Sequence, residues 1–481
     1  MLLWMDGFDA YGTNTTDITT LISQSGYGIS LGGGGTTINS ESDTRTGIGF
    51  SARNSAGGYF YLAFGVTSGI VTGMAIKLVS VSGVICKFVY NNLLGTLSDQ
   101  MVLYANGENG ISLTTGDQEL IAASLPNCLF PGTWQYLEVS YSPSPTAGSI
   151  QVKLDGVAVI NIASGKTSKT GQPNSVNQLN FSGSTLAPQS FGSMNIMFDD
   201  LYVCDNSGGS FNTFLGDCVV HTIYPNSDAG PNQMTINGGD ATHHYASING
   251  AVPNGANYLS DNTPGVFASS LFTETSTNNF LATDTVQVGS KTYTFVASYT
   301  NTDGDVTVGA SFLLSMGNLI AAINLGAGAG TAYATAMTAN TEVSAVMTTN
   351  SSFTVTALTD GPGGNSYPSV YTASGTSAGS FAAATLLSGA VGHAELFGLP
   401  TFPVDIIDVL AVAVNVRAQK TAAGAATYQA SMKLSSTEVD GPAQPVTTGY
   451  LTRQFVQTSP PGGGVWTLTN AEALLIGIKL P

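Results

Sequence analysis

The sequence predicts a mainly β protein built from successive antiparallel, sandwich-like sheets. Short stretches of alternating apolar and polar residues recur along the chain and are cut by Gly, Pro and Asn, most clearly in 132–161, 198–216, 283–365 and 463–479. Only 9% of the residues are charged, so Ser, Thr, Asn and Gly must supply the polar surface. These residues disfavour long helices, whereas strands and tight turns tolerate them.

The length and the charge of the chain limit its architecture and its partners. At 481 residues it exceeds what one hydrophobic core supports, and we expect two to four domains. Thirteen basic residues against 30 acidic ones leave a formal net charge of -17, which argues against nucleic acid and anionic membrane surfaces as partners.

No targeting or membrane segment is expected. Residues Met1–Asp6 are too short for a signal peptide and lack its basic region. The longest apolar stretch, near Ile406–Val416, is interrupted by Asp408 and Asn415 and falls short of the roughly 18 apolar residues of a membrane helix. We therefore expect a chain that is made in a cytosol and stays soluble, with small buried thiols rather than disulfides at its cysteines. The cysteines are Cys86, Cys128, Cys204 and Cys218.

Residues 1–213 have the strand pattern of one large antiparallel domain. The stretch 134–141 alternates cleanly, and Asp155-Gly156 joins two further stretches, 149–154 and 157–162, into a hairpin. A late strand over 194–203 completes the domain. The two faces predicted for 134–141 carry Trp134, Tyr136 and Glu138 on one side and Leu137 and Val139 on the other.

This domain resembles the concanavalin-A-like (laminin-G-like) jelly roll. The resemblance rests on Gly132–Tyr136, the hairpin Val152–Val157 and the strand Phe198–Val203, and it covers most of residues 1–213. It implies a two-layered sandwich of a class that includes lectins and glycoside hydrolases.

A second β domain is predicted in two pieces, 214–269 and 394–481. Its opening motifs, Phe214–Asp217 and His221–Asn226, are similar to proteins of tailed bacteriophages, in which such a segment follows the jelly roll. The expected continuation appears only from Glu395 onward. The intervening residues, 270–393, are therefore predicted to be an insertion, which exposed loops with neighbouring ends tolerate.

The insertion is predicted to be a small α+β module. A hairpin joins 285–288 to 291–295, and a helix is expected over 310–324, followed by a Gly-rich stop at 326–330. The module resembles small domains of phage tail and tail-fibre proteins; the matching segments are Thr285–Gly289, Tyr293–Phe295, Leu319–Asn324 and Gly361–Asn365. The apolar face of the predicted helix carries Phe312, Met316, Leu319, Ile320 and Ile323.

Catalytic motifs are weak throughout the chain. Ser30 and Ser377 each match GxSxG, but the serine elbow needs a strand before it and a helix after it, and neither is indicated. Two carboxylate pairs, Asp117 with Glu119 and Glu438 with Asp440, have the spacing of glycosidase acids on one strand face. We expect turns or solvated sheet edges at both pairs, with Asp117 and Glu119 the first candidates if the chain were an enzyme.

Histidines and aspartates suggest one metal at most. His221, His243, His244 and His393 lack zinc-ligand spacing and are predicted on the surface or in turns. The late strand carries Asp199 and Asp200, with Asp205 beyond them, and these three could donate oxygens to Ca²⁺, as in jelly-roll lectins. Alternatively, one aspartate of the pair faces solvent and the other caps a loop. No other cofactor is expected.

Aromatic side chains offer a second way to contact sugars, by stacking on the apolar faces of pyranose rings. Alternation places half of them inward, and Trp134 is predicted in the core rather than on a sugar platform. No particular glycan site is predicted. The aromatic residues of the first domain include Tyr59, Tyr61, Tyr90, Tyr104, Trp134 and Tyr136.

The resemblance as a whole implies a structural protein of a bacteriophage virion rather than an enzyme. We expect a tail-associated or tail-fibre component that contacts other virion proteins and, through the jelly roll, host surface carbohydrate. Two alternatives remain: a capsid decoration or head-fibre protein, and a glycan depolymerase. A symmetric homo-oligomer is expected for a particle-bound protein, with a homotrimer favoured.

Overall fold

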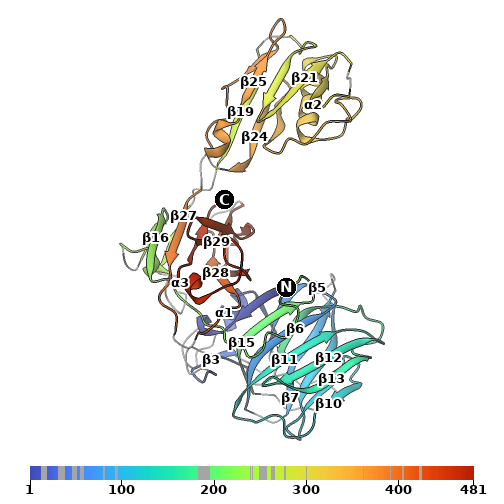
Figure 1. The fold of residues 1–481 in the computed structure, drawn as a ribbon, viewed down its shortest axis with the longest axis vertical. Coiled ribbons are helices and arrows are strands. Elements are labelled where there is room, and N and C mark those ends of the chain that lie inside the picture. The colour runs from blue at the N-terminus through green and yellow to red at the C-terminus, as the bar shows by residue number, and fades with distance from the viewer. Residues whose placement is uncertain are drawn as a thin grey trace. The chain divides into compact units, whose positions relative to one another are not determined.

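The computed structural model confirms a mainly β protein with several antiparallel sheets (Figure 1). The chain forms two compact units, residues 1–260 with 395–478 and residues 261–394 with 479–481. In the described residues no helix is both long and apolar enough to span a membrane. The structure describes residues 1–11, 19–30, 38–45, 51–54, 59–79, 82–92, 96–182, 195–238, 240, 242–248, 257–261, 266–275, 278–298, 301–360, 362–389, 392–403, 406–421 and 425–481. Met194 and Gly361 of the predicted motifs lie outside these ranges.

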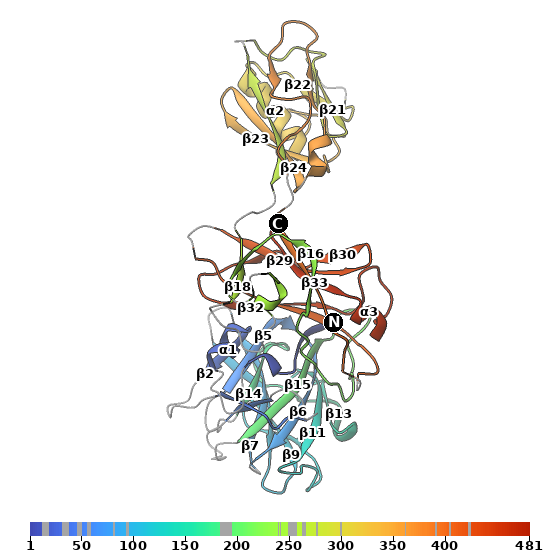
Figure 2. The ribbon, with the colours of Figure 1, turned by 90° about the vertical axis from the view of Figure 1, so that its left-hand side faces the viewer.

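The N-terminal part of the first unit is a sandwich of two sheets, seen as two layers in Figure 2. Its core is continuous and includes a cluster of stacked rings, Phe60 on Phe181 with centroids 4.7 Å apart. The first sheet runs β13 (Val157–Gly165), β12 (Gly148–Leu154), β11 (Trp134–Ser142), β6 (Ile70–Leu78), β15 (Ile196–Asp205), β4 (Ser51–Asn54) and β3 (Ile38–Glu41), with β1 (Leu2–Asp6) also paired to β15. The second sheet runs β10 (Leu120–Ala123), β9 (Ile111–Thr115), β8 (Leu97–Ala105), β7 (Gly83–Asn91), β14 (Val176–Ser182), β5 (Tyr59–Thr67) and β2 (Tyr27–Ser30).

Local predictions in this sandwich are confirmed. Leu154 pairs with Val157 across the Asp155-Gly156 turn, where both turn residues have positive φ, 49° and 79°. The two faces of β11 also separate as expected, since Leu137 and Val139 lie in the sandwich core and Tyr136 lies in a different cluster. That second face is buried as well, because the segment 211–218 and residues Ala411 and Val456 pack over it.

The rest of the first unit is a second set of sheets. One runs β16 (Ser227–Asn232), β27 (Ala394–Gly398), β33 (Leu475–Lys479), β29 (Thr427–Leu434) and β30 (Thr437–Asp440), with β31 (Gln444–Pro445) on β29. Strands β28 (Val412–Ala418) and β32 (Leu451–Gln457) form a ribbon, and so do β17 (Thr235–Asn237) and β18 (Tyr258–Ser260). The short helix α3 (Leu468–Glu472) completes it, whereas α1 (Thr19–Gln24) places Ile22 in the core of the jelly roll. The Trp466 ring anchors its core with Met432 and Leu474.

The second unit contains two four-stranded sheets and one helix around a core of its own. The predicted hairpin is β20 on β21, and the predicted helix is α2, which begins after the N-cap Ser311. Phe312, Met316 and Leu319 of α2 are buried, as predicted. One sheet runs β23 (Val343–Thr349), β24 (Ser352–Asp360), β19 (Phe267–Glu274) and β26 (Gly379–Phe381). The other runs β22 (Asp305–Thr307), β21 (Lys291–Val296), β20 (Thr285–Val288) and β25 (Ser369–Thr372). Helix α2 spans Phe312–Asn324. The predicted insertion bounds, 270–393, lie inside this unit.

Candidate functional site

The outer face of the second jelly-roll sheet carries an ordered set of polar and aromatic side chains. Its strands turn Phe60, Phe88 and Leu179 into the core, so the residues between them project to the opposite side. In the strand register, Asn180 lies beside Tyr61 on β5 and beside Lys87 on β7. The central amide of this row is buried, since Asn180 is only 3% exposed, whereas Tyr61 and Lys87 keep partial exposure.

A second row runs beside the first. Gln178 lies between Ala63 and Val89, and Val89 lies opposite Asp99 of β8. The Gln178 amide donates to Asn180 Oδ1 at 2.7 Å, so each amide holds the other in orientation. An amide carries both donors and acceptors, but Gln178 and Asn180 are only 2% and 3% exposed, so the capacity that the pair retains lies beneath the surface.

The charges on these two rows cancel. Lys87 Nζ lies 3.3 Å from Asp99 Oδ2, with the lysine side chain 12% exposed and the aspartate 27% exposed. No other Asp, Glu, Lys, Arg or His belongs to the described residues of the two rows. The rows therefore present dipoles rather than net charge.

One buried amide beside the rows lacks a partner. Gln100 is the extra residue of a bulge in β8, between Asp99 and Met101, and it is fully buried. Neither its Nε2 nor its Oε1 has a hydrogen-bond partner, and the same holds for the nearby Ser98 hydroxyl. A buried polar atom without a partner costs about 1–3 kcal/mol, so such a group in a native fold calls for a bound water or ligand.

The aromatic part of the face is held flat by a glycine. Gly28 of β2 pairs with Tyr61, and a Cβ at position 28 would lie only 1.9 Å from the Tyr61 ring. The ring therefore lies across the β2 backbone, with the Tyr59 ring 6.2 Å away. Val102 and Tyr104 belong to a small buried apolar cluster on the same side of the sheet. A phenol ring held in this way offers its π face to the C–H side of a sugar.

The structure sorts the predicted aromatic candidates between the two sheets. Tyr59, Tyr61 and Tyr104 lie on the face just described, whereas Trp134 and Tyr136 lie on the outer face of the other sheet. Trp134 is only partly buried, and its Nε1 donates to Asp43 Oδ1 at 3.1 Å. Trp134 thus packs against a core cluster, as predicted, but this cluster lies between the sheet and the adjoining segment and not inside the sandwich.

The carboxylate pairs lie in a turn and at a sheet edge, as predicted. Asp117 and Glu119 lie in the turn between β9 and β10, and they pair with Lys169 at 3.6 Å and with Lys166. Glu438 and Asp440 lie on the edge strand β30. Ser377 precedes strand β26 rather than a helix, and its hydroxyl donates to the Gly379 carbonyl. The residues that follow Ser30, and its side chain, lie outside the described part of the chain.

The three aspartates predicted as calcium ligands do not lie together. Asp199 and Asp200 are buried neighbours on β15, whereas Asp205 is the last residue of that strand. A strand rises ~3.3 Å per residue, so the Cα atoms of Asp200 and Asp205, five residues apart, are separated by on the order of 15 Å. With ligand distances of about 2.3–2.6 Å, one ion cannot take both carboxylates.

N–H groups already occupy the carboxylate oxygens of the Asp199–Asp200 pair. Asp199 accepts from the Arg45 and Asp200 amides, and Asp200 accepts from the Val220 amide at 2.8 Å and lies 3.5 Å from Arg45 Nη1. Burial, with the neighbouring Asp200 charge, raises the pKa of Asp199 to about 9. Asp200 thus caps a loop, as the alternative prediction for this pair stated, but neither aspartate faces solvent.

These contacts do not fit a calcium ion at the pair. Among the residues that the structure describes, no group of three His, Cys, Asp or Glu is arranged to hold a metal. The positions of these side chains therefore do not support the prediction of one calcium ion shared by Asp199, Asp200 and Asp205.

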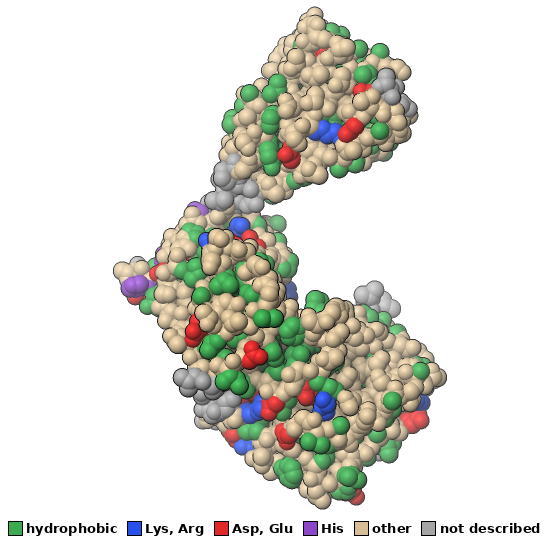
Figure 3. Space-filling view, in the orientation of Figure 1, with side chains coloured by type: hydrophobic (Ala, Val, Ile, Leu, Met, Phe, Trp, Pro, Cys, Tyr) green, Lys and Arg blue, Asp and Glu red, His purple; other side chains and the backbone are tan. Residues whose placement is uncertain are grey.

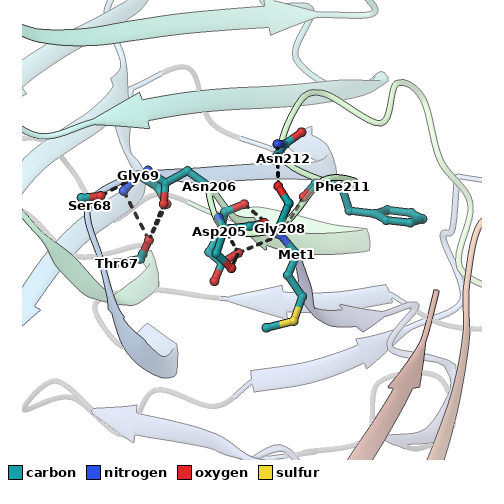
Figure 4. Close-up of polar contacts among 10 residues, drawn as sticks. Met1, Thr67, Ser68, Gly69, Asp205, Asn206, Gly208, Phe211 and Asn212 are labelled. Atoms are coloured by element: carbon teal, nitrogen blue, oxygen red, sulfur yellow. Dashed lines mark hydrogen bonds and ion pairs between the residues drawn. The ribbon is translucent and has the colours of Figure 1, made fainter.

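Asp205 instead binds the α-ammonium of Met1 (Figure 4). Its Oδ1 lies 2.7 Å from the nitrogen, and the carbonyls of Ser207 and Phe211 accept at 2.6 and 3.3 Å. Burial works to raise the pKa of Asp205, but the ammonium and Ser207 outweigh it and hold that pKa below its ordinary value. The ammonium thus provides the positive charge that a metal would have provided.

Sequence reasoning missed two acids that hold several hydrogen bonds: Glu138 joins the jelly roll to the segment that follows it, and Asp6 joins strand β1 to Tyr11 and Tyr27. Glu138, 1% exposed, accepts from Tyr202 Oη at 2.6 Å and from the Gly216 amide at 2.9 Å. Asp6 accepts from Tyr11 and Tyr27 hydroxyls, and burial raises its pKa to about 6. Both were hidden because an acid within an alternating strand is ordinarily solvated.

The histidines and cysteines depart partly from expectation. His243 lies on the surface with Asp240, and His244 lies in the bend before the turn 245–247, where it is only 14% exposed and 3.1 Å from the buried Glu395. His393 pairs with Asp261. All four cysteines are free thiols; Cys86 and Cys204 are buried as predicted, and Cys128 and Cys218 are only partly buried.

The comparisons with known proteins concern the fold alone. No family model and no curated protein sequence matches the chain. Among solved structures, the cellulose-induced protein Cip1 matches 45% of this chain and 100% of its own at 12% identity and a TM-score of 0.31. The alginate lyase Aly36B matches 41% of this chain and 95% of its own, at 14% identity and a TM-score of 0.31. The carbohydrate-binding module CBM66 from Bacillus subtilis matches 37% of this chain and 94% of its own, at 10% identity and a TM-score of 0.25. By their names, the lyase is a carbohydrate-active protein and CBM66 is a carbohydrate-binding one.

The prediction that the chain is not an enzyme is contradicted by these matches. Besides the lyase, they include a sialidase and a carbohydrate esterase from a Shiga toxin-encoding bacteriophage. A β-sandwich of this kind without a recognisable motif therefore does not exclude an enzyme. At TM-scores of 0.25 to 0.31 the likenesses identify no reaction for this chain.

Proposed function

We propose that the protein is a glycan-binding component of a tailed-bacteriophage virion. The observation that supports glycan binding is the Tyr61–Asn180–Lys87 row, in which Tyr61 and Lys87 are partly exposed over the buried Asn180, with the buried, unpartnered Gln100 amide beside it. A sugar needs paired donors and acceptors for its hydroxyls and a flat apolar surface for its C–H face. The row and its flanking residues supply both.

Charge favours a neutral glycan over an acidic one. Lys87 and Asp99 neutralise each other on the face, and the chain as a whole carries -17. An anionic polysaccharide would have to approach against that field, without a free cation in the two rows to compensate.

Binding can be measured with the full chain on an array of bacterial capsular and O-antigen polysaccharides. We expect Tyr61→Ala and Asn180→Ala each to weaken binding about tenfold, which corresponds to the loss of about 1.4 kcal/mol. Tyr258→Ala is the matched control, because Tyr258 is an exposed tyrosine on β18, outside the jelly roll. The proposal fails if no polysaccharide binds, or if the control variant loses binding equally.

The same assay separates binding from cleavage. Polysaccharides that bind are incubated with the protein, and reducing ends and unsaturated ends are counted. Products that disappear in Tyr61→Ala would make the face a depolymerase site, whereas intact polysaccharide would leave it a binding site.

The virion assignment rests on the sequence resemblance of 214–226, of 395 onward and of the inserted module to phage proteins. We propose a tail or tail-fibre location, with other virion proteins as partners and a symmetric homo-oligomer as the assembled form. Mass spectrometry of separated tails and heads tests it: the protein should be recovered with tails. Recovery with tailless heads alone would favour the capsid-decoration alternative, and absence from the particle would overturn the proposal.

A further inference from the structure

A lysine and an asparagine face each other across two strands of the second jelly-roll sheet. Lys87 of β7 is directly opposite Asn180 of β14, and both project to the outer side, since the adjoining Phe88 and Leu179 lie in the core. The Cβ atoms of residues opposed in this way are about 4.5–5.5 Å apart. The flexible four-carbon stem of lysine spans such a distance, so Nζ can be brought against the side-chain amide of Asn180.

The surroundings of Lys87 are unusual for a lysine. The chain has only 13 Lys and Arg among 481 residues, and Figure 3 shows few of them on the side in view. The Lys87 side chain is 12% exposed, against 32% for Lys166. Val102, opposite Lys87 on β8, and Val89, further along β7, are fully buried. Desolvation of this kind activates a lysine amine as a nucleophile.

Asp99 provides the group that such an amine needs for proton transfer. Its Oδ2 lies 3.3 Å from Lys87 Nζ. A carboxylate at this range can take a proton from an ammonium and later return it to a leaving group. Asp99 lies on β8 and Asn180 on β14, so Lys87 has a base on one side and an amide on the other.

The side-chain amide of Asn180 is held and polarised by its neighbour. Gln178 Nε2 donates to Asn180 Oδ1 at 2.7 Å, and the two residues are only 2% and 3% exposed. A donor on this oxygen draws electrons from Cγ and stabilises the negative charge that develops when a nucleophile adds to Cγ. Because burial excludes water, an amine at Cγ meets little competition from hydrolysis.

We propose that Lys87 and Asn180 form an intramolecular amide cross-link between β7 and β14. Asp99 accepts a proton from the Lys87 ammonium, and the Nζ lone pair attacks Asn180 Cγ. The Gln178 N–H holds the resulting oxyanion. Asp99 then returns the proton to Nδ2, the Cγ–Nδ2 bond breaks, and the ammonia that leaves carries off the surplus proton of Nζ as ammonium. One C–N bond forms and one breaks, and the reaction needs no oxidant and no second substrate.

The cross-link does not depend on glycan binding and is compatible with it. The new bond replaces the Lys87 ammonium and the Asn180 amide by one neutral amide, so the face gains no cation that would attract an acidic glycan. Positions 87 and 180 lie far apart in the sequence, and a bond between them restricts the unfolded chain. The sandwich is thereby stabilised, as by a disulfide that closes a long loop.

The test is the mass of the intact, denatured full chain, measured without any polysaccharide. We expect the wild type to be lighter than its sequence by the mass of one ammonia. Lys87→Arg keeps the positive charge but lacks the nucleophilic amine, and both Lys87→Arg and Asn180→Ala should have the full sequence mass. Asp99→Ala should slow bond formation about a hundredfold, followed as the linked fraction over time after purification.

Lys77→Arg is the matched control. Lys77 forms an ion pair with Asp43, as Lys87 does with Asp99, but it lies opposite Trp134 and Met197 rather than an asparagine. This variant should keep the loss of one ammonia. In a digest of the wild type, fragmentation of the branched peptide should join residue 87 to residue 180.

Three results would overturn the proposal: a wild type with the full sequence mass, an ammonia loss that persists in Lys87→Arg, or a branched peptide that joins Lys87 to another residue. Thermal unfolding shows whether each variant is folded. If Asn180→Ala fails to fold, Asn180→Asp replaces it. Any link to that aspartate releases water, so a persistent loss of ammonia would equally refute the cross-link. Failure of this test leaves glycan binding by the face unaffected.

Discussion

The side chain of Asn324 forms two hydrogen bonds with the backbone of Ala345, one from Nδ2 to the carbonyl and one from the N–H to Oδ1. Asn324 is the last residue of α2, and Ala345 lies in the middle of the edge strand β23. The amide thus occupies the place of a neighbouring peptide group. One helix residue both joins α2 to the sheet and removes a site at which another strand could pair.

We predict that Asn324→Ala destabilises the second unit by about 1–3 kcal/mol, because Ala345 is nearly buried and both of its backbone groups would lose their partners. Urea unfolding of the full chain measures the loss. Asn318→Ala is the control on the same helix; Asn318 makes one such bond, to the Thr307 carbonyl, and should cost less. Equal losses for both variants would refute the special role of Asn324.

A second prediction concerns Asp6, whose pKa burial raises to about 6. Because the folded state holds this proton more tightly than the unfolded state, its contribution to stability is complete below about pH 4 and is lost as the pH rises to 6, by about 3 kcal/mol. Asp6→Asn should remove this decline. The measurement is the free energy of unfolding of both proteins at pH 4 to 7. Parallel curves for the two proteins would contradict the prediction.

Asp205 should show the opposite pH dependence. The Met1 ammonium and Ser207 hold its pKa below the ordinary value against the effect of burial, so its contribution is present above about pH 4 and is lost as the pH falls through the lowered pKa. Asp205→Asn should therefore lower the melting temperature at pH 7 and have little effect at pH 2. A variant that melts like the wild type at pH 7 would show that the ammonium contact contributes nothing.

Gly28 offers a test of the candidate face without deleting any of its side chains. Gly28→Ala places a methyl group against the Tyr61 ring and should tilt it away from the sheet, weakening glycan binding about tenfold. Gly65→Ala on the adjoining strand is the control, since nothing lies within 4 Å of its added Cβ. Binding to the array polysaccharides and melting temperature are measured together. Unchanged binding in a folded Gly28→Ala variant would remove Tyr61 from the site.

Sequence periodicity by itself determined the local structure. The hairpin at Asp155-Gly156, the two faces of 134–141 and the buried face of α2 follow from patterns that span only a few residues, because alternation and helical spacing act between chain neighbours. The turn at Asp117 and the edge position of Glu438 followed from the same kind of signal.

Only the tertiary structure decided which side chains meet. Tyr61, Asn180 and Lys87 belong to strands separated by many residues, and they share a row because β14 inserts between β5 and β7. Glu138 and Asp199 are buried because another part of the chain covers a strand face that alternation alone would leave to solvent. Strand order and coverage arise from contacts between distant segments, which a single sequence does not display locally.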